Sequence, residues 1–95
     1  MNNFKPYKPK NEKEKALASA FLKLKTEQEA ANFLRDLLTI KEFEEFANRL
    51  EMARLLKQGM SYKAIAKKIG VSTTTVTRTA NWLFRGCGGY DKILS

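Results

Sequence analysis

The sequence predicts an all-α fold, a bundle of five to six helices that includes a helix-turn-helix. Apolar residues recur three and four positions apart through most of the 95 residues, which is the period of an amphipathic helix. Residues 61–80 combine an apolar stripe, a glycine and a helix-capping serine in the order of a helix-turn-helix. No segment alternates apolar and polar residues in the manner of a strand. The length allows one domain, or one half of an intertwined dimer.

The first half of the chain predicts an arm and three helices. Residues 1–11 contain both prolines, several lysines and no apolar period, so we expect a flexible basic arm. A first helix is expected over about residues 12–25. Thr26 and Thr39 are each followed three residues later by a glutamate, the pattern of a capping box, so each is expected to begin a further helix. Gly59 is expected to end the third helix. The residues expected to face inward are Leu17, Ala20, Phe21, Leu24, Ala30, Ala31, Leu34, Leu37, Leu38, Phe43, Phe46, Ala47, Leu50, Ala53 and Leu56.

The helix-turn-helix is predicted from side chains that fall in register. Its apolar seam consists of Ile65, Ala66, Ile69 and Val76. Gly70 stands where the chain must turn, because glycine tolerates backbone conformations that a Cβ disfavours. Ser72 is expected to cap the second helix. That helix is expected to continue to about Arg85, after which a Gly-rich segment ends it with flexible backbone.

The charge of the chain is positive and unevenly distributed. The net charge is +8, and residues 52–90 contain seven Lys and Arg but no Asp or Glu. A positive surface without interspersed acids attracts a polyanion, and contacts with phosphates release counterions from DNA. Because this stretch coincides with the helix-turn-helix, double-stranded DNA is the predicted partner.

Other function classes lack the residues that they need. The chain has no histidine and one cysteine, Cys87, so an enzyme is not expected, nor a metal site, nor a required cofactor. A single cysteine fits a reducing cytoplasm. No apolar run approaches the roughly 20 residues that span a bilayer, and no signal-peptide pattern opens the chain, so no membrane partner is expected.

These observations together predict a sequence-specific DNA-binding protein in the cytoplasm. Its segments are a basic arm, a helical dimerisation region, a helix-turn-helix DNA-binding region and a Gly-rich tail, which span residues 1–11, 12–58, 59–85 and 86–95. Lysines are expected to contact phosphates, and threonines to contact base edges or phosphates. The candidate DNA-binding residues are Tyr62, Lys63, Lys67, Ser72, Thr73, Thr74, Thr75, Thr77 and Arg78.

A homodimer is the expected assembly. The first three helices carry four of the six phenylalanines, and Phe33 lies off the main apolar stripe of its helix. A small bundle could bury these side chains within one chain. One helix-turn-helix reads only a short half-site, and a two-fold dimer doubles that reading. We therefore expect the dimer to be built from the first three helices.

Several segments resemble the Trp repressor family. They are Leu37-Leu38-Thr39, Glu42, Arg49, Leu55-Leu56, Gly59, Met60-Ser61 and Thr75-Val76-Thr77-Arg78 with Asn81. With the Gly86-x-Gly88-Gly89-Tyr90 tail, the chain is most similar to the YerC/YecD branch of Trp repressor-related proteins, over about residues 12–90. The resemblance implies an intertwined all-helical homodimer that binds operator DNA as a transcriptional regulator. As in the family, a repressor is expected, in the bacterial cytoplasm and associated with the nucleoid when bound to DNA.

The resemblance also implies a candidate effector pocket. Arg49 and Arg78 match two arginines that flank a bound indole ring in the family, and Thr39 matches a contact to the ligand carboxylate from the partner subunit. Thr79 stands where the family has a glycine, and Trp82 stands where it has a serine. The large indole of Trp82 is expected to narrow the pocket. L-tryptophan is therefore not the expected effector, although another small effector stays open. The alternative assigns Arg49 to a helix surface, Arg78 to a phosphate, and Trp82 to the core or a dimer contact.

Three other functions use similar features. A non-specific DNA-binding or recombination accessory protein would carry the same helix-turn-helix. A helix-turn-helix protein-interaction module would not need the acid-free stretch of residues 52–90. A membrane-surface protein would need a long basic amphipathic helix, whereas the apolar stripes here serve a bundle.

Overall fold

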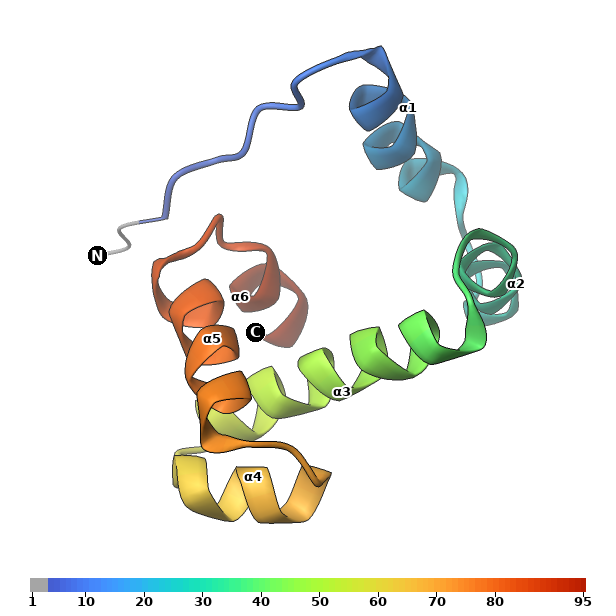
Figure 1. The fold of residues 1–95 in the computed structure, drawn as a ribbon. Helices are drawn as coiled ribbons and strands as arrows, with labels where there is room; N and C mark the ends of the chain where they lie inside the picture. Colours follow the sequence, from blue (N-terminus) through green and yellow to red (C-terminus); the bar gives the residue numbers. More distant parts are fainter. Residues whose placement is uncertain (1–3) are drawn as a thin grey trace. The chain divides into compact units, whose positions relative to one another are not determined.

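A computed structural model describes residues 4–95 and confirms the all-α class, since these residues form helices and no strand (Figure 1). In chain order the helices are α1 (Glu12–Ala20), the 3₁₀ helix η1 (Phe21–Lys23), α2 (Glu27–Leu37), α3 (Ile40–Lys57), α4 (Tyr62–Ile69), α5 (Thr73–Arg85) and α6 (Gly89–Leu94). The start of the predicted arm, residues 1–3, lies outside the described residues. The chain divides into two units, one of Tyr7–Glu44 and one of Glu45–Ser95 together with the first residues. Every helix within residues 4–95 is too short or too polar to cross a bilayer.

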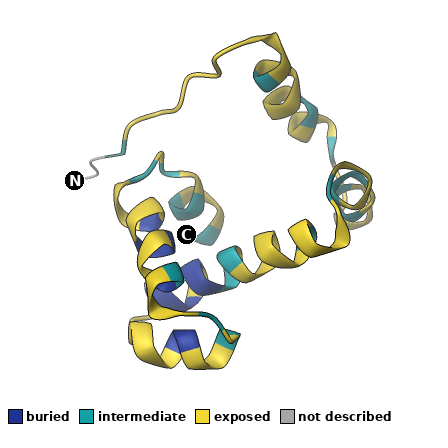
Figure 2. Cartoon of the chain, viewed as in Figure 1, coloured by how far each residue is buried: buried dark blue, intermediate teal, exposed yellow. Residues whose placement is uncertain are grey.

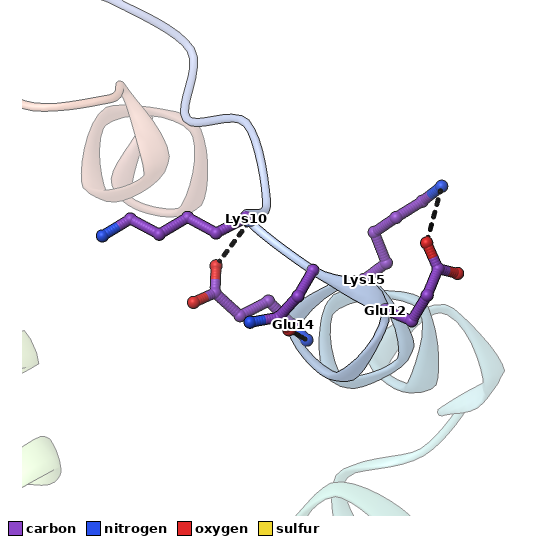
Figure 3. Close-up of polar contacts among 5 residues, drawn as sticks. Lys10, Glu12, Glu14 and Lys15 are labelled. Atoms are coloured by element: carbon purple, nitrogen blue, oxygen red, sulfur yellow. Dashed lines mark hydrogen bonds and ion pairs between the residues drawn. The ribbon is translucent and has the colours of Figure 1, made fainter.

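The first unit begins with a coil that is attached to α1 through Glu14. Its carboxylate accepts hydrogen bonds from the Tyr7 hydroxyl at 2.8 Å and from the Lys10 backbone N–H at 2.9 Å, the second of which Figure 3 shows. These bonds, the Lys10 bond foremost, lower the pKa of Glu14. Asn11 caps α1 by accepting the Glu14 backbone N–H at 3.0 Å. Residues 4–11 of the predicted arm therefore form no helix, but their last part is bonded to the first turn of one.

Both predicted caps are present, and the capping box is complete at Thr39. The Thr26 hydroxyl accepts the Glu29 backbone N–H at 3.1 Å, while the Glu29 carboxylate bonds the N–H of Lys25, one residue before the cap, at 2.9 Å. At the start of α3 the exchange is reciprocal. The Thr39 hydroxyl accepts from the Glu42 N–H at 3.1 Å, and the Glu42 carboxylate accepts from the Thr39 N–H at 2.9 Å. The local pattern alone was therefore sufficient to predict where α2 and α3 begin.

The first predicted helix is shorter than expected. α1 ends at Ala20 rather than near residue 25, and the chain tightens into η1 before Leu24 becomes extended, with φ −82° and ψ 130°. The reason is the next cap, because Thr26 must also be extended to serve as an N-cap and has φ −130° and ψ 159°. The helix therefore has to end before the residues that precede Thr26.

The buried core belongs to the second unit and lies between the last turns of α3, α4 and α5 (Figure 2). It consists of Met52, Ala53, Leu55, Leu56, Ile65, Ala66, Val76, Thr79, Ala80 and Leu83. The predicted inward positions Ile65, Ala66 and Val76 are confirmed, and Ile69 is partly buried against the same cluster. The helix-turn-helix therefore rests on the end of α3.

Within one chain, the side chains of α3 that were expected to face inward are not buried over its first turns. Phe46 and Leu50 are 46% and 42% exposed, Ala47 is also exposed, and only Ala53 and Leu56 of the predicted stripe are buried. Instead α3 buries Met52 and Leu55, on the side that meets α4 and α5. Periodicity locates an apolar face, but which side becomes covered depends on the other elements.

The Tyr7–Glu44 unit contains no buried residue. Leu17 and Phe21, which were expected to face inward, are each 44% exposed, and Leu22 is 85% exposed. The rings of Phe21 and Phe33 meet edge to face with centroids 5.4 Å apart. These contacts leave most of the apolar surface of α1 and α2 open within one chain.

The Gly-rich tail is helical where flexible backbone was expected. Gly88 adopts φ +87° before α6, and Tyr90 and Leu94, one turn apart, pack against the core. A Cβ at Gly88 would lie 3.1 Å from the Phe4 ring, and the Lys5 N–H donates to the Gly86 carbonyl at 3.3 Å. The prediction was wrong because it relied on the three glycines and gave no importance to the helical spacing of Tyr90 and Leu94.

Candidate nucleic-acid interface

Two short capped helices joined by a left-handed glycine form the predicted helix-turn-helix. Gly70 has φ +86°, and its N–H donates to the Ala66 carbonyl at 2.9 Å. Ser72 caps α5 as predicted by accepting the Thr75 N–H at 3.2 Å. Ser61 caps α4 in the same way, which the sequence also signals by a serine before an apolar stripe but which was not predicted. These local bonds determine where α5 begins.

The candidate DNA-binding residues lie together on α4, the turn and α5. Eight of the nine are exposed, and Thr75 is half-buried. The exposed ones are Tyr62, Lys63, Lys67, Ser72, Thr73, Thr74, Thr77 and Arg78. Their exposure leaves them accessible to a partner, while their contact with DNA stays a prediction.

The threonine hydroxyls of α5 differ in what they already bond. The Thr77 hydroxyl donates to the Thr73 carbonyl at 2.9 Å, and that of Thr75 lies 3.1 Å from the Ser72 hydroxyl. Among residues 4–95 the hydroxyls of Thr73 and Thr74 have no hydrogen-bond partner. Thr74 and Thr73 are therefore best able to donate to a base edge or a phosphate.

The cations of α4 and α5 form no ion pair within the described chain. The two acids that border the acid-free stretch are both engaged by α3: Glu51 pairs with Arg54 at 2.6 Å, and Asp91 pairs with Lys57 at 3.1 Å. The hydrogen bond from Arg54 is the main cause that lowers the pKa of Glu51, and the charge of Lys68 is close enough to lower it further. In the part of the chain that is described, no ion pair involves Lys63, Lys67, Lys68 or Arg78. These cations are available for phosphates.

The candidate effector residues are only partly brought together. The Arg49 guanidinium lies over the Trp82 ring at 5.7 Å. Among the described residues, no hydrogen bond, ion pair or cation–ring contact involves Arg78 together with another candidate effector residue. Thr39 belongs to the other unit, where its hydroxyl caps α3. Thr79 is buried, with its hydroxyl donating to the Thr75 carbonyl at 3.3 Å.

Trp82 is not a core residue, because 51% of its surface is exposed. The alternative that placed it in the core is wrong for the single chain, and its role in a dimer contact stays a prediction. The hollow beside Arg49, lined also by Glu45, Asn48, Met52, Val71 and Thr75, has a volume of about 160 Å³. Ligand pockets commonly have about 300–1,000 Å³, so this hollow is small for an aromatic amino acid.

An all-α scaffold that carries a capped helix, a left-handed turn and a second capped helix defines a helix-turn-helix protein. The chain belongs to the Trp repressor family, since the model of the Trp repressor protein family matches residues 12–95. The resemblance found in the sequence is thereby confirmed.

Relatives and solved structures agree with this membership. The chain is 38% identical to the uncharacterised protein YerC of Bacillus subtilis (strain 168) over 78 residues, 82% of this chain and 75% of YerC. It is similar to the crystal structure of a TrpR-like protein from Eubacterium eligens ATCC 27750, with TM-score 0.81, 37% identity and coverage of 88% of this chain and 87% of the other. A Staphylococcus aureus protein, proposed to be a Trp repressor, gives TM-score 0.81 and 33% identity over 90% and 85% of the two chains.

Proposed function

We propose that the protein is a sequence-specific DNA-binding transcriptional regulator, a repressor, that acts on double-stranded DNA in the bacterial cytoplasm and is associated with the nucleoid when bound. One observation carries the proposal. The first turn of α5 exposes the hydroxyls of Thr73 and Thr74, which have no described partner, on a helix-turn-helix whose cations form no described ion pair. Hydroxyls supply base contacts, and cations supply phosphate contacts. Membership of the Trp repressor family supports the same conclusion.

We further propose that the regulator is a homodimer. The side chains that α1, α2 and the first turns of α3 expose in one chain support this, as does a groove of about 560 Å³ lined by Tyr7, Pro9, Glu14, Leu17, Ala18 and Phe21. Apolar surface of this extent is rarely left in water by a stable protein. A second copy brings the matching apolar surface and a second α5.

Competition between two DNA duplexes tests the proposed function. A labelled duplex from the region upstream of the protein's own gene is titrated by fluorescence anisotropy, at two salt concentrations and with random duplex as competitor. We expect the upstream duplex to survive competition and its affinity to fall steeply with salt. Equal binding of both duplexes would favour the non-specific or recombination accessory role. Absence of binding at low salt would favour a protein-interaction module.

Thr74→Ala and Lys63→Ala are expected to change DNA binding in different ways. Removal of the Thr74 hydroxyl takes away about 1 kcal/mol of base contact and lowers the preference for the upstream duplex about fivefold. Lys63→Ala weakens both duplexes alike and lowers the salt slope by about one, because one phosphate is no longer neutralised. The same anisotropy titrations measure both quantities.

Thr77→Ala is the matched control for Thr74→Ala. Thr77 is exposed on the same helix, but its hydroxyl proton is already donated to Thr73, so its removal is expected to change the preference less. If Thr74→Ala weakened upstream and random duplex by equal factors, the base-reading role of Thr74 would be refuted.

We also propose that no metal or cofactor is required and that L-tryptophan is not the effector. Addition of L-tryptophan is expected to shift the melting temperature by less than about 1 °C and to leave DNA affinity unchanged. The physical reason is the Trp82 ring, which already lies against Arg49. A ligand at 100 times its Kd would add about 2.7 kcal/mol to the free energy of unfolding. A clear rise in either quantity would therefore contradict this proposal.

A further inference from the structure

Arg49 lies between two aromatic rings that come from different helices. Its guanidinium carbon is 5.3 Å from the centre of the Phe46 ring on α3 and 5.7 Å from the centre of the Trp82 ring on α5. Both distances fall within the range of cation–π attraction. Arg49 forms no ion pair with any residue in 4–95. The two rings are therefore its described partners, and through Trp82 it joins the middle of α3 to α5.

The surroundings of Arg49 restrict where its charge can lie. The Arg49 side chain is half-buried. Tyr90 of α6 is close enough for the Arg49 charge to oppose the rise in its pKa that burial causes. The charge of Arg49 therefore acts on aromatic side chains of three helices, α3, α5 and α6.

Trp82 is well placed to set the rotation of α5. On a helix, residues three, four and seven positions apart share a face, so Trp82 lies on the same stripe as Arg78 and Thr75. Three of the four core side chains of α5 are apolar, and the hydroxyl of the fourth, Thr79, is bonded within α5 itself. Burial of apolar area has little directional preference. A cation stacked on a ring at the flank of that core does have a preferred direction.

We propose that Arg49 and Trp82 are positioning residues for DNA recognition, whose stacking holds α5 against α3 so that its first turn meets the bases in register. This inference rests on the proposed function. Neither residue needs to contact DNA for this role. Because the stack is half-exposed, its removal leaves the fold intact and acts on recognition.

Four variants and one control test the proposal. Trp82→Ala and Arg49→Gln remove the stack, while Trp82→Phe and Arg49→Lys retain a ring or a cation. Phe84→Ala is the control, because Phe84 is 53% exposed on the same helix as Trp82, which is 51% exposed, and has no described cation over its ring. Each variant is measured for its preference between upstream and random duplex, its salt slope and its melting temperature.

Trp82→Ala and Arg49→Gln are expected to lower the preference for the upstream duplex over the random duplex about tenfold, which is within the range that one base contact supplies. The salt slope of both variants is expected to stay unchanged. Their melting temperatures are expected to change no more than that of Phe84→Ala. Trp82→Phe and Arg49→Lys should recover most of the preference. Because Trp82 is the single tryptophan, its emission should also change in Arg49→Gln, which reports the stacking without DNA.

Three results would overturn the proposal while the proposed function stands. The first is a wild-type duplex preference in Trp82→Ala, and the second is an equal decrease of that preference in Phe84→Ala. The third is a lower salt slope in Arg49→Gln, which would make Arg49 a phosphate contact. A melting temperature that falls with the preference would show a structural role and would also overturn it. If the wild-type protein has no preference, the proposed function fails and the positioning role fails with it, whatever the emission of Trp82 shows.

Discussion

Leu50→Glu is expected to convert the homodimer into single chains and to weaken binding to the upstream duplex by about 100-fold or more, the gain that two linked binding modules commonly provide. Leu50 is 42% exposed in one chain, and Phe46, one turn earlier on α3, is 46% exposed. A carboxylate placed in an apolar interface without a partner costs several kcal/mol. The substitution therefore acts on the interface rather than on the core.

The Tyr7–Glu44 unit supports the same expectation. It contains no buried residue, and its large apolar side chains Leu22 and Ile40 are 85% and 59% exposed. Burial of apolar surface is the main favourable term in folding and must offset the loss of conformational entropy. Helices that bury so little apolar surface within their own chain are expected to be covered by a partner, and the proposed second copy has apolar surface of the same kind to offer.

Sedimentation at micromolar concentration measures the result directly. The wild-type protein is expected to have the mass of two chains, and Leu50→Glu the mass of one. Asn48→Glu is the control, because it adds the same charge to an exposed position on another face of α3. Circular dichroism shows whether the helices persist in each variant. A wild-type mass of one chain would refute the dimer, and a Leu50→Glu mass of two chains would show that this face of α3 lies outside the interface.

Local chemistry made the helix-turn-helix predictable. A cap requires a side-chain oxygen that accepts a free N–H two or three residues later, and a left-handed turn favours glycine. Ser72 and Gly70 could therefore be predicted from the sequence. Asn11 and Ser61 cap α1 and α4 by the same chemistry. They were missed although the residue types were visible.

Burial was harder to predict because it depends on residues distant in sequence. The apolar stripe through Phe46 and Leu50 was identified, but nothing local shows whether α4 and α5 or another chain covers it. α6 was missed because Tyr90 and Leu94 become a helix face only when the core lies beneath them.

For the candidate interface, the sequence was sufficient to predict which side chains are exposed but not which of their hydroxyls already form hydrogen bonds. The helical register placed Thr74 and Thr77 on the surface of α5. Which hydroxyl is free depends on side-chain rotamers, and only the structure shows that Thr77 donates to Thr73. The stacking of Arg49 on Trp82 likewise depends on how α3 meets α5.

Leu55→Ala is expected to cause the largest decrease in stability among single substitutions in the core. Leu55 is 1% exposed within the cluster that α3 forms with α4 and α5. Removal of a buried leucine side chain commonly costs about 2–5 kcal/mol, because it leaves a cavity in addition to removing buried apolar area. For a domain of this size the melting temperature should fall by about 10 °C or more. The two proteins must be compared at equal concentration, since dimerisation makes stability concentration-dependent.

Ile93→Ala is the control for Leu55→Ala because it removes the same number of carbon atoms from a side chain that is 71% exposed. It should change the free energy of unfolding by no more than about 0.5 kcal/mol. Equal melting temperatures for the two variants would contradict the assignment of Leu55 to the core. A domain with about 5–15 kcal/mol of stability stays mostly folded after a decrease of this size, so Leu55→Ala should keep the wild-type preference between duplexes at 25 °C. Leu55→Ala should therefore lower stability and leave the duplex preference unchanged. Replacement of Thr74, Arg49 or Trp82 is expected to lower the duplex preference and leave stability unchanged, so the two results together would distinguish a core residue from a recognition residue.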